Sequence, residues 1–275
     1  MDTTAKYKAM IHFAHANGFP AQSYRKLMTS IDPNFKLIAL EKFAHNPRFP
    51  LNNNWANQVE ELLDYLESEQ QALQASLPVI LVGHSFGAVI SYLAACKCPS
   101  MFAGLIMLDP PLVTGAASWI FKFAKRNRLI DKITPAGKTN IRNKQWHHSD
   151  DLVEYFSQRA LFRNMDPECI ADYVDAVTSR EGDHLHLTFS TDVEANIFRT
   201  LPDNLHQFSG QLQCPGFLVT GSETDVCIPS LRKRFLKANP TLEHEELTFG
   251  GHMFPLERPI ELAQRLNVLL KEIVG

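Results

Sequence analysis

The stretch Val79-Ile80-Leu81-Val82-Gly83-His84-Ser85-Phe86-Gly87 decides the fold of this chain. Its first four residues form an uninterrupted apolar run with two valines and an isoleucine, which is typical of a strand buried on both faces. A helical pattern follows from Ser85 to about Cys98. The stretch therefore predicts a buried strand, a tight turn and a helix, with the Ser85 hydroxyl held at the carboxyl edge of a sheet.

On both sides of this unit, short β-rich runs alternate with helical patterns, which favours βαβ units and a largely parallel sheet. We therefore predict an α/β fold in which a mainly parallel sheet of about six strands is flanked by helices. The other strands are expected at 7–14, 35–40, 105–108, 216–220 and 243–249, and the other core helices at 55–76, 229–238 and 259–274.

Residues 112–208 interrupt this alternation. The segment is mostly helical by pattern, lacks a convincing buried strand, and follows Asp109-Pro110-Pro111, where two prolines end the preceding strand. Residues 112–149 hold eight Lys/Arg against one acid, whereas residues 150–203 hold four Arg against twelve Asp/Glu. We predict an α/β core domain formed by residues 1–111 and 209–275, with a helical cap inserted at residues 112–208.

The composition sets limits on function. The chain has 275 residues, of which 45% are hydrophobic and 21% charged, so it can build a sizeable core. Its 27 Lys/Arg against 30 Asp/Glu give a formal charge of −3, which argues against nucleic acid as a partner. No apolar run approaches the roughly 20 residues of a spanning helix, and residues 1–6 do not begin a secretory signal, so we expect a cytoplasmic protein without stable membrane insertion. Reduced thiols are expected, without a disulfide frame, from Cys96, Cys98, Cys169, Cys214 and Cys227.

The turn after the buried strand has the pattern Gly-x-Ser-x-Gly, in the strand-to-helix context that a serine nucleophile requires. A side chain at position 83 or 87 would collide with the neighbouring strand or helix, and glycine at both positions avoids this collision. A serine hydroxyl also needs a base that is oriented by a carboxylate. His252, after the two glycines that follow the last strand, is the predicted base, and Asp225, beyond the preceding strand, is the predicted acid.

With these three residues the chain resembles the α/β-hydrolase superfamily, specifically its lid-bearing serine hydrolases. The resemblance implies a Ser85-His252-Asp225 triad and hydrolysis of carboxylic esters of small to medium substrates through an acyl-enzyme. Such relatives often have Gly-x-x-Asp-x-x-x-Pro around the acid. Asp225 to Pro229 match the second half, but the first half is one residue longer, which leaves Glu223 and Asp109 as alternative acids.

The resemblance also implies two backbone N–H donors for the developing oxyanion. One is that of Phe86, directly after the nucleophile. The second is that of Phe19, because His15-Ala16-Asn17-Gly18-Phe19-Pro20 resembles the family's His-Gly-Phe-Pro loop, with Asn17 where histidine is usual. His15 is the alternative side chain for bracing this loop.

Fold alone does not fix the chemistry, because the same triad serves carbon–carbon bond hydrolases, thioesterases, lyases and perhydrolases. A ligand-binding protein on the same scaffold is a non-catalytic alternative. Serine at position 85 argues against epoxide hydrolases and haloalkane dehalogenases, which use aspartate there. We expect a small-molecule acyl substrate and neither cofactor nor metal, since Asp183-His184-Leu185-His186 lacks further ligands at useful spacing. The oligomeric state is left open.

Residues 119–126 form a basic amphipathic stretch within the predicted cap. Its aromatic and aliphatic side chains are Trp119, Ile120, Phe121 and Phe123. The favoured interpretation is a lid helix that buries these side chains over the active site. The alternative is a helix that lies on a lipid surface.

Overall fold

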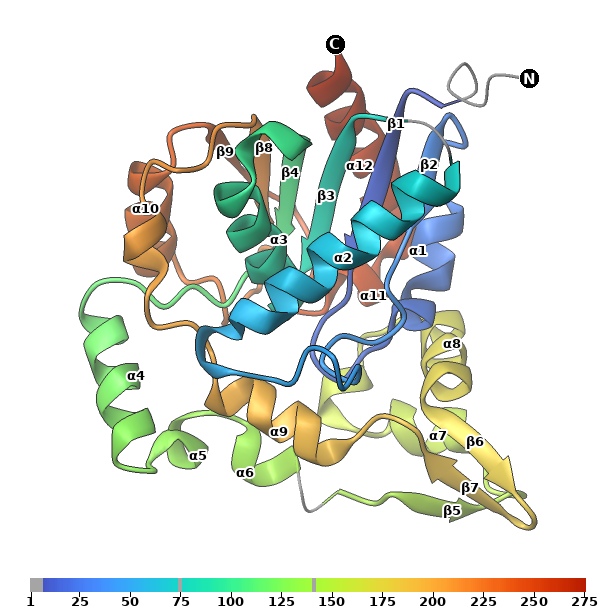
Figure 1. Cartoon of the computed structure of the whole chain (residues 1–275). Coiled ribbons are helices and arrows are strands. Elements are labelled where there is room, and N and C mark those ends of the chain that lie inside the picture. Colours follow the sequence, from blue (N-terminus) through green and yellow to red (C-terminus); the bar gives the residue numbers. More distant parts are fainter. Residues whose placement is uncertain (1–6, 74–75, 140–141) are drawn as a thin grey trace.

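The computed structural model describes residues 7–73, 76–139 and 142–275, and its centre is a six-stranded sheet (Figure 1). The strand order is β2-β1-β3-β4-β8-β9, and every neighbouring pair is parallel. The sheet confirms the predicted fold class. Its strands are β1 (Ala9–Ala14), β2 (Phe35–Ile38), β3 (Val79–His84), β4 (Phe102–Leu108), β8 (Gly216–Thr220) and β9 (Leu242–Glu246).

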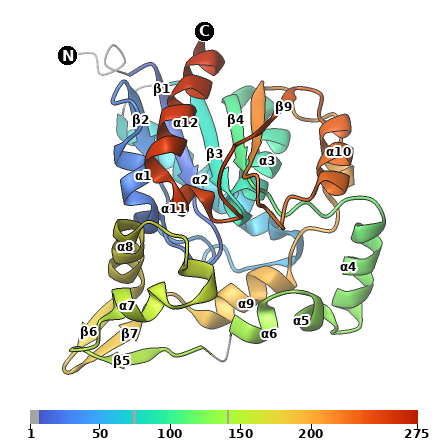
Figure 2. The ribbon, with the colours of Figure 1, turned by 180° about the vertical axis from the view of Figure 1, so that it is seen from behind.

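The central strands are buried because helices cover both faces of the sheet. Every residue of β1 and β3 is buried. Leu62, Val89 and Phe235 belong to the apolar cluster on one face, and Leu27 and Leu266 to the cluster on the other. Figures 1 and 2 show these two layers from opposite sides. The first layer holds α2 (Ala56–Leu73), α3 (Phe86–Lys97) and α10 (Pro229–Ala238), and the second holds α1 (Arg25–Thr29), α11 (Phe254–Glu257) and α12 (Pro259–Val274).

Residues 112–208 lie beyond the carboxyl edge of the sheet, at the bottom of Figure 1. Among the described residues of this segment, six α-helices connect β4 to β8. The helices are α4 (Ala116–Arg126), α5 (Ile130–Ile133), α6 (Ala136–Thr139), α7 (Leu152–Ser157), α8 (Pro167–Val177) and α9 (Thr191–Arg199). Short 3-10 helices complete the chain at η2 (Ala21–Tyr24), η3 (Asn53–Trp55), η4 (Pro99–Met101), η5 (Ala160–Phe162) and η6 (Leu205–Phe208).

The same segment also contains a small antiparallel sheet, which the sequence analysis did not predict. Its strand order is β5-β7-β6, with β5 (Gln145–His147), β6 (Thr178–Glu181) and β7 (His184–Leu187). Most residues of β6 and β7 are exposed or half-buried, so the strands lack the continuous apolar run that marks a core strand.

Several predicted elements recur with the same bounds, namely the strand 216–220 and the helices 229–238 and 259–274. Two predictions concern residues outside the described ranges. The helix predicted at 55–76 includes residues 74–75, and the expected lack of a secretory signal concerns residues 1–6. Within the described ranges, no helix is both long and apolar enough to cross a membrane.

Candidate active site

Ser85 lies in a strained turn between β3 and α3. Its φ of 53° and ψ of −114° are unusual for a residue with a side chain. A Cβ atom at Gly87 would collide with the backbone of Ala14 and His15, and one at Gly83 would collide with the backbone of Gly87. The predicted reason for both glycines is therefore confirmed, and the turn holds the Ser85 side chain at the carboxyl edge of the sheet.

His252 connects Ser85 to a buried carboxylate. Its Nε2 lies 3.0 Å from Ser85 Oγ, and its Nδ1 lies 2.6 Å from Oδ2 of Asp109. Asp109 is fully buried at the end of β4, whereas His252 comes from the loop after β9. Because an ionised carboxylate only accepts, Nδ1 of His252 carries its hydrogen, and Nε2 is left to accept from the Ser85 hydroxyl.

The partner of His252 is therefore Asp109, and the prediction of Asp225 is corrected on this point. Thr224 stands where the family pattern Gly-x-x-Asp, counted from Gly221, would have its acid. The Thr224 hydroxyl donates to Asp109 Oδ2 at 2.6 Å. The extra residue in this loop moves Asp225 one position farther, where its exposed side chain lines the pocket instead. Glu223, the other alternative acid, is also exposed.

A second chain of hydrogen bonds, through Tyr24 and His84, holds the backbone of His252 in place. His84 is fully buried, and burial holds its pKa well below the ordinary value, so its ring is neutral. Its Nε2 donates to the carbonyl oxygen of His252 at 2.9 Å, which leaves Nδ1 to accept from the Tyr24 hydroxyl at 2.7 Å. Tyr24 in turn accepts from the N–H of Ala16 at 3.3 Å. These bonds link the loop after β1 to the backbone of His252. Tyr24 is not among the site residues predicted from the sequence.

The two predicted oxyanion donors have different surroundings. Phe86 is the first residue of α3, so its N–H has no partner within the helix. The N–H of Phe19, by contrast, donates to the carbonyl oxygen of Ala16 at 3.1 Å in a tight turn through Gly18. The prediction of Phe19 as a donor is corrected, because its hydrogen is already engaged.

Side chains on both sides brace this loop. His15 donates from Nδ1 to the carbonyl oxygen of Ala16, and its Nε2 accepts from the N–H of Phe43. Burial lowers the pKa of His15 to about 4, so it serves as a neutral brace. Asn17 donates its side-chain amide to the carbonyl oxygen of Glu194 in α9. The alternative role considered for His15 thus agrees with its contacts.

A cavity of about 500 Å³ opens over Ser85 and His252. Residues of the sheet edge and of the 112–208 segment line it together. Its walls are mainly apolar and include Trp55, Phe86, Phe121, Phe162, Tyr173 and Phe198. The polar lining includes Asp225, Asn17 and an ion pair in which Arg142 Nη2 lies 2.5 Å from Glu194 Oε2. The pocket can therefore hold an apolar group beside the Ser85 hydroxyl.

Helix α4 contributes less to this cavity than predicted. Phe121 lines it, but the side chains of Trp119, Ile120 and Phe123 point into solvent. The expectation that the helix buries its aromatic side chains over the site therefore holds for Phe121 alone.

The histidines of β7 are not arranged as a metal site. His184 is exposed and His186 is half-buried on β7, the middle strand of the small sheet. Within residues 7–73, 76–139 and 142–275, no group of three His, Cys, Asp or Glu side chains is placed to hold a metal ion.

Comparison with known sequences gives one family. The model described as "Alpha/beta hydrolase family" matches residues 13–265. A monoglyceride lipase homolog of Monkeypox virus is 26% identical over 132 residues, which cover 46% of this chain and 47% of that protein. Human monoglyceride lipase is 35% identical over 60 residues, 22% of this chain and 20% of the lipase. The matched parts thus span about half or less of these relatives.

Solved structures resemble the whole chain. The peroxisomal alpha-beta-hydrolase Lpx1 of Saccharomyces cerevisiae superposes with a TM-score of 0.78 at 13% identity, covering 100% of this chain and 79% of that one. E-2-(acetamidomethylene)succinate hydrolase gives a TM-score of 0.74 at 15% identity, with 96% and 91% covered. At these identities the likeness shows the fold alone.

Proposed function

Because this chain belongs to the alpha/beta hydrolase family, we propose that it is a serine hydrolase that cleaves carboxylic ester bonds of small to medium substrates through an acyl-enzyme. The observation that carries the proposal is the continuous contact from Ser85 Oγ to His252 and on to Asp109, at 3.0 and 2.6 Å, at the wall of an apolar cavity. This arrangement has the geometry of an activated nucleophile, its base and the group that orients the base.

In the proposed reaction, Ser85 attacks the ester carbonyl carbon while His252 Nε2 takes the hydroxyl proton. Asp109 keeps the imidazole in the required tautomer and stabilises the imidazolium that forms. His252 then gives its proton to the leaving alkoxide, and the acyl group remains on Ser85. A water molecule, deprotonated by His252, releases the carboxylic acid and restores the serine hydroxyl.

The oxyanion requires donors that are free to bind it. Phe86 N–H is one. In the loop after β1, the N–H of Ala16 already donates to the Tyr24 hydroxyl, and the N–H of Phe19 donates to the carbonyl oxygen of Ala16. Among the described residues of this loop, the backbone N–H groups of Asn17 and Gly18 remain as candidate donors. Asn17 lines the cavity, so we assign the second donor to its backbone N–H.

Residues 112–208 would then act as a cap that closes the acyl pocket. Phe121, Phe162 and Phe198 come from this segment and would exclude water from the reacting atoms, which strengthens hydrogen bonds to the oxyanion. The named monoglyceride lipases among the relatives support including monoacylglycerols among the candidate substrates.

Turnover of p-nitrophenyl esters, monoacylglycerols, acyl thioesters and β-diketones by the purified protein tests the proposal. We expect the ester substrates to have the highest kcat/KM and Ser85→Ala to lose at least a thousandfold in kcat, to roughly the level left by binding and oxyanion contacts. A fluorophosphonate should label Ser85 in the wild type. Ester turnover that survives Ser85→Ala, or preference for thioesters or diketones, would contradict it.

A further inference from the structure

Helix α4 exposes an apolar stripe that nothing in the chain covers within the described residues. Trp119, Ile120 and Phe123 are 75%, 60% and 63% exposed. At 100° per residue, Trp119 and Phe123 lie 40° apart on the helix surface, and Ile120 lies 60° beyond Phe123. Phe121 lies 100° beyond Ile120 and lines the pocket, and Ala124, between these two side chains, is buried in the core. The helix therefore has two apolar sides, and one of them faces water, which is unusual for a protein that remains free in solution.

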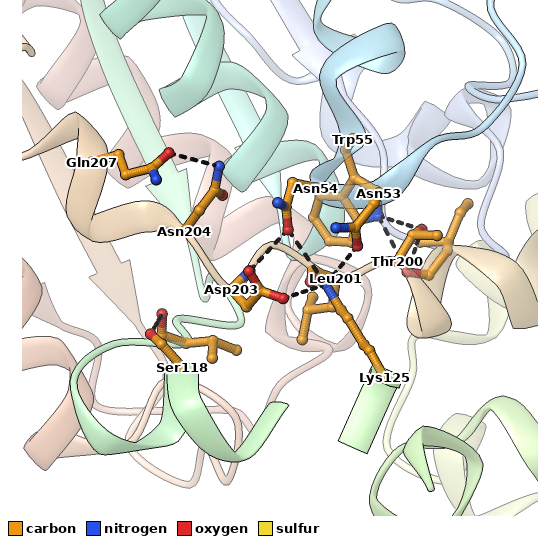
Figure 3. Close-up of polar contacts among 12 residues, drawn as sticks. Asn53, Asn54, Trp55, Ser118, Lys125, Thr200, Leu201, Asp203, Asn204 and Gln207 are labelled. Atoms are coloured by element: carbon orange, nitrogen blue, oxygen red, sulfur yellow. Dashed lines mark hydrogen bonds and ion pairs between the residues drawn. The ribbon is translucent and has the colours of Figure 1, made fainter. Parts of the chain in front are cut away.

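The stripe is held in this orientation by a half-buried lysine on the same helix (Figure 3). Lys125 Nζ donates to Asn53 Oδ1 at 2.9 Å and to the carbonyl oxygen of Leu201, and it pairs with Asp203 Oδ2 at 3.0 Å. Asn54 Oδ1 accepts from both Lys125 and the N–H of Asp203. These contacts tie α4 to the loop before α2 and to the chain after α9, so the outward side chains are presented on an anchored helix.

Cations border the stripe and line a cleft beside it. Lys122 and Arg126 lie on the same side of α4 as Trp119, and Arg234 of α10 packs against Gly115 at the start of the helix. All three line a cavity of about 1050 Å³. None of them forms an ion pair with a carboxylate in the described parts of the chain, and the one acid in the cleft, Asp203, is already paired with Lys125. The cleft therefore has unneutralised positive charge.

We propose that this surface, formed by the outer side of α4 and the adjoining cleft, docks on membranes that carry anionic phospholipids. Trp119, Ile120 and Phe123 would enter the boundary between headgroups and acyl chains, as the apolar side of an interfacial helix does. Lys122, Arg126 and Arg234 would contact lipid phosphates. The charge of the region favours this partner, because residues 112–149 hold eight Lys/Arg against one acid. The proposal does not depend on the chemistry of Ser85.

Vesicles of ether-linked phosphatidylglycerol, which contain no carboxylic ester, provide the test, with ether-linked phosphatidylcholine for comparison. We expect co-sedimentation with the anionic vesicles at low salt, at least tenfold weaker binding to phosphatidylcholine, and loss of binding in 0.5 M NaCl, a concentration of about threefold the physiological ionic strength. Trp55 and Trp146 are buried, so a blue shift of tryptophan fluorescence on binding would report on Trp119. Trp119→Phe should remove that shift while the protein still sediments.

Variants separate the parts of the proposal. Phe123→Ser should weaken binding to the anionic vesicles, and the double variant Lys122→Gln/Arg126→Gln should weaken it more than tenfold, since each cation near such a surface contributes about fivefold. Val268→Ser and Lys8→Gln remove an exposed apolar side chain and a cation elsewhere and should bind like the wild type. Thermal unfolding followed by circular dichroism checks that each variant is folded.

Four results would overturn the proposal. They are equal binding to both lipids, no sedimentation with either, a dimer that Phe123→Ser dissociates and vesicles do not, and a Trp119 fluorescence change caused by glycerol 3-phosphate without vesicle binding. The third would assign the stripe to a second copy of the chain. The fourth would assign the cleft to a free phosphate compound.

Discussion

Thr224 and His252 donate to the same oxygen of Asp109, each at 2.6 Å. Asp109 is the last carboxylate before the prolines that end β4, and Thr224 lies in the loop after β8, the next strand of the sheet. The hydroxyl therefore occupies the place of the expected acid and supplies a hydrogen bond, while the charge comes from the neighbouring strand. A carboxylate that accepts two hydrogen bonds is fixed in position and orients the imidazole.

Substitution of Asp109 should be far more damaging to catalysis than substitution of Asp225. Asparagine at 109 would favour the wrong tautomer of His252 and should lower kcat for a p-nitrophenyl ester on the order of 10⁴-fold. Asp225→Asn and Glu223→Gln, at exposed positions, should each change kcat less than about tenfold, because neither side chain is hydrogen-bonded to His252. A collapse of kcat in Asp225→Asn with Asp109→Asn nearly silent would reverse the assignment.

Tyr24→Phe should affect both stability and catalysis, because it leaves Nδ1 of buried His84 without a donor and Ala16 N–H without an acceptor. We expect a loss of about 1–3 kcal/mol in the free energy of unfolding. We also expect a lower kcat with little change in KM, since the loop of Ala16 and the backbone of His252 would both lose a support.

Tyr92→Phe is the matched control for that variant. Tyr92 is also fully buried, and its single hydroxyl hydrogen is shared between Asn239 Oδ1 at 3.0 Å and the carbonyl oxygen of Phe208 at 3.2 Å, away from the site. Its replacement should lower stability by a similar amount and leave kcat unchanged. Equal kcat values in the two variants at a temperature where both are folded would show that the Tyr24 bonds are structural only.

Glu61 should make stability depend on pH. Burial raises the pKa of its carboxyl group from 4.5 to about 7, although its Oε2 accepts from the N–H of Ala44 at 2.9 Å. The folded state binds this proton more tightly than the unfolded state does. The resulting contribution of Glu61 to the free energy of unfolding is therefore present in full below pH 4.5 and is lost as the pH rises through 7. Glu61→Gln keeps an acceptor for Ala44 but cannot ionise.

We therefore expect Glu61→Gln to raise Tm relative to the wild type by roughly 5 °C at pH 8 and by much less at pH 4.5. Tm should be measured by calorimetry for both proteins across this range. A constant difference in Tm at every pH would mean that the ionisation of Glu61 is not linked to folding.

The sheet and its main helices were predictable because local signals agree with tertiary burial. The continuous apolar run Val79–Val82 is stable only as a buried strand. Pro229 and Pro259 begin helices at positions where a missing N–H costs nothing. The bounds of α10 and α12 follow from these signals. The strands β6 and β7 were not predictable in this way, because their residues are exposed or half-buried and form no continuous apolar run.

The acid and the second oxyanion donor depend on contacts that sequence order does not encode. Asp109 and Asp225 both follow strands that end at the same edge of the sheet, so either could face His252. Only the three-dimensional course of the loop after β8 separates them. Likewise, the engagement of Phe19 N–H arises from a turn closed by Gly18, and its sequence resembles that of an open loop.

Phe121 and Phe123 should have different effects on acyl-chain preference, although they are two residues apart on α4. Phe121 lines the cavity over Ser85, whereas Phe123 points into solvent. Phe121→Ala would enlarge the cavity of about 500 Å³ and should shift the preference among p-nitrophenyl acetate, butyrate and octanoate toward the longer esters. Each added methylene can contribute at most ~1–3 kcal/mol to this discrimination. Phe123→Ala should leave the ratios of kcat/KM unchanged, and these ratios do not depend on the fraction of folded protein. If Phe123→Ala shifts the ratios and Phe121→Ala does not, α4 closes over the site in a different orientation during turnover.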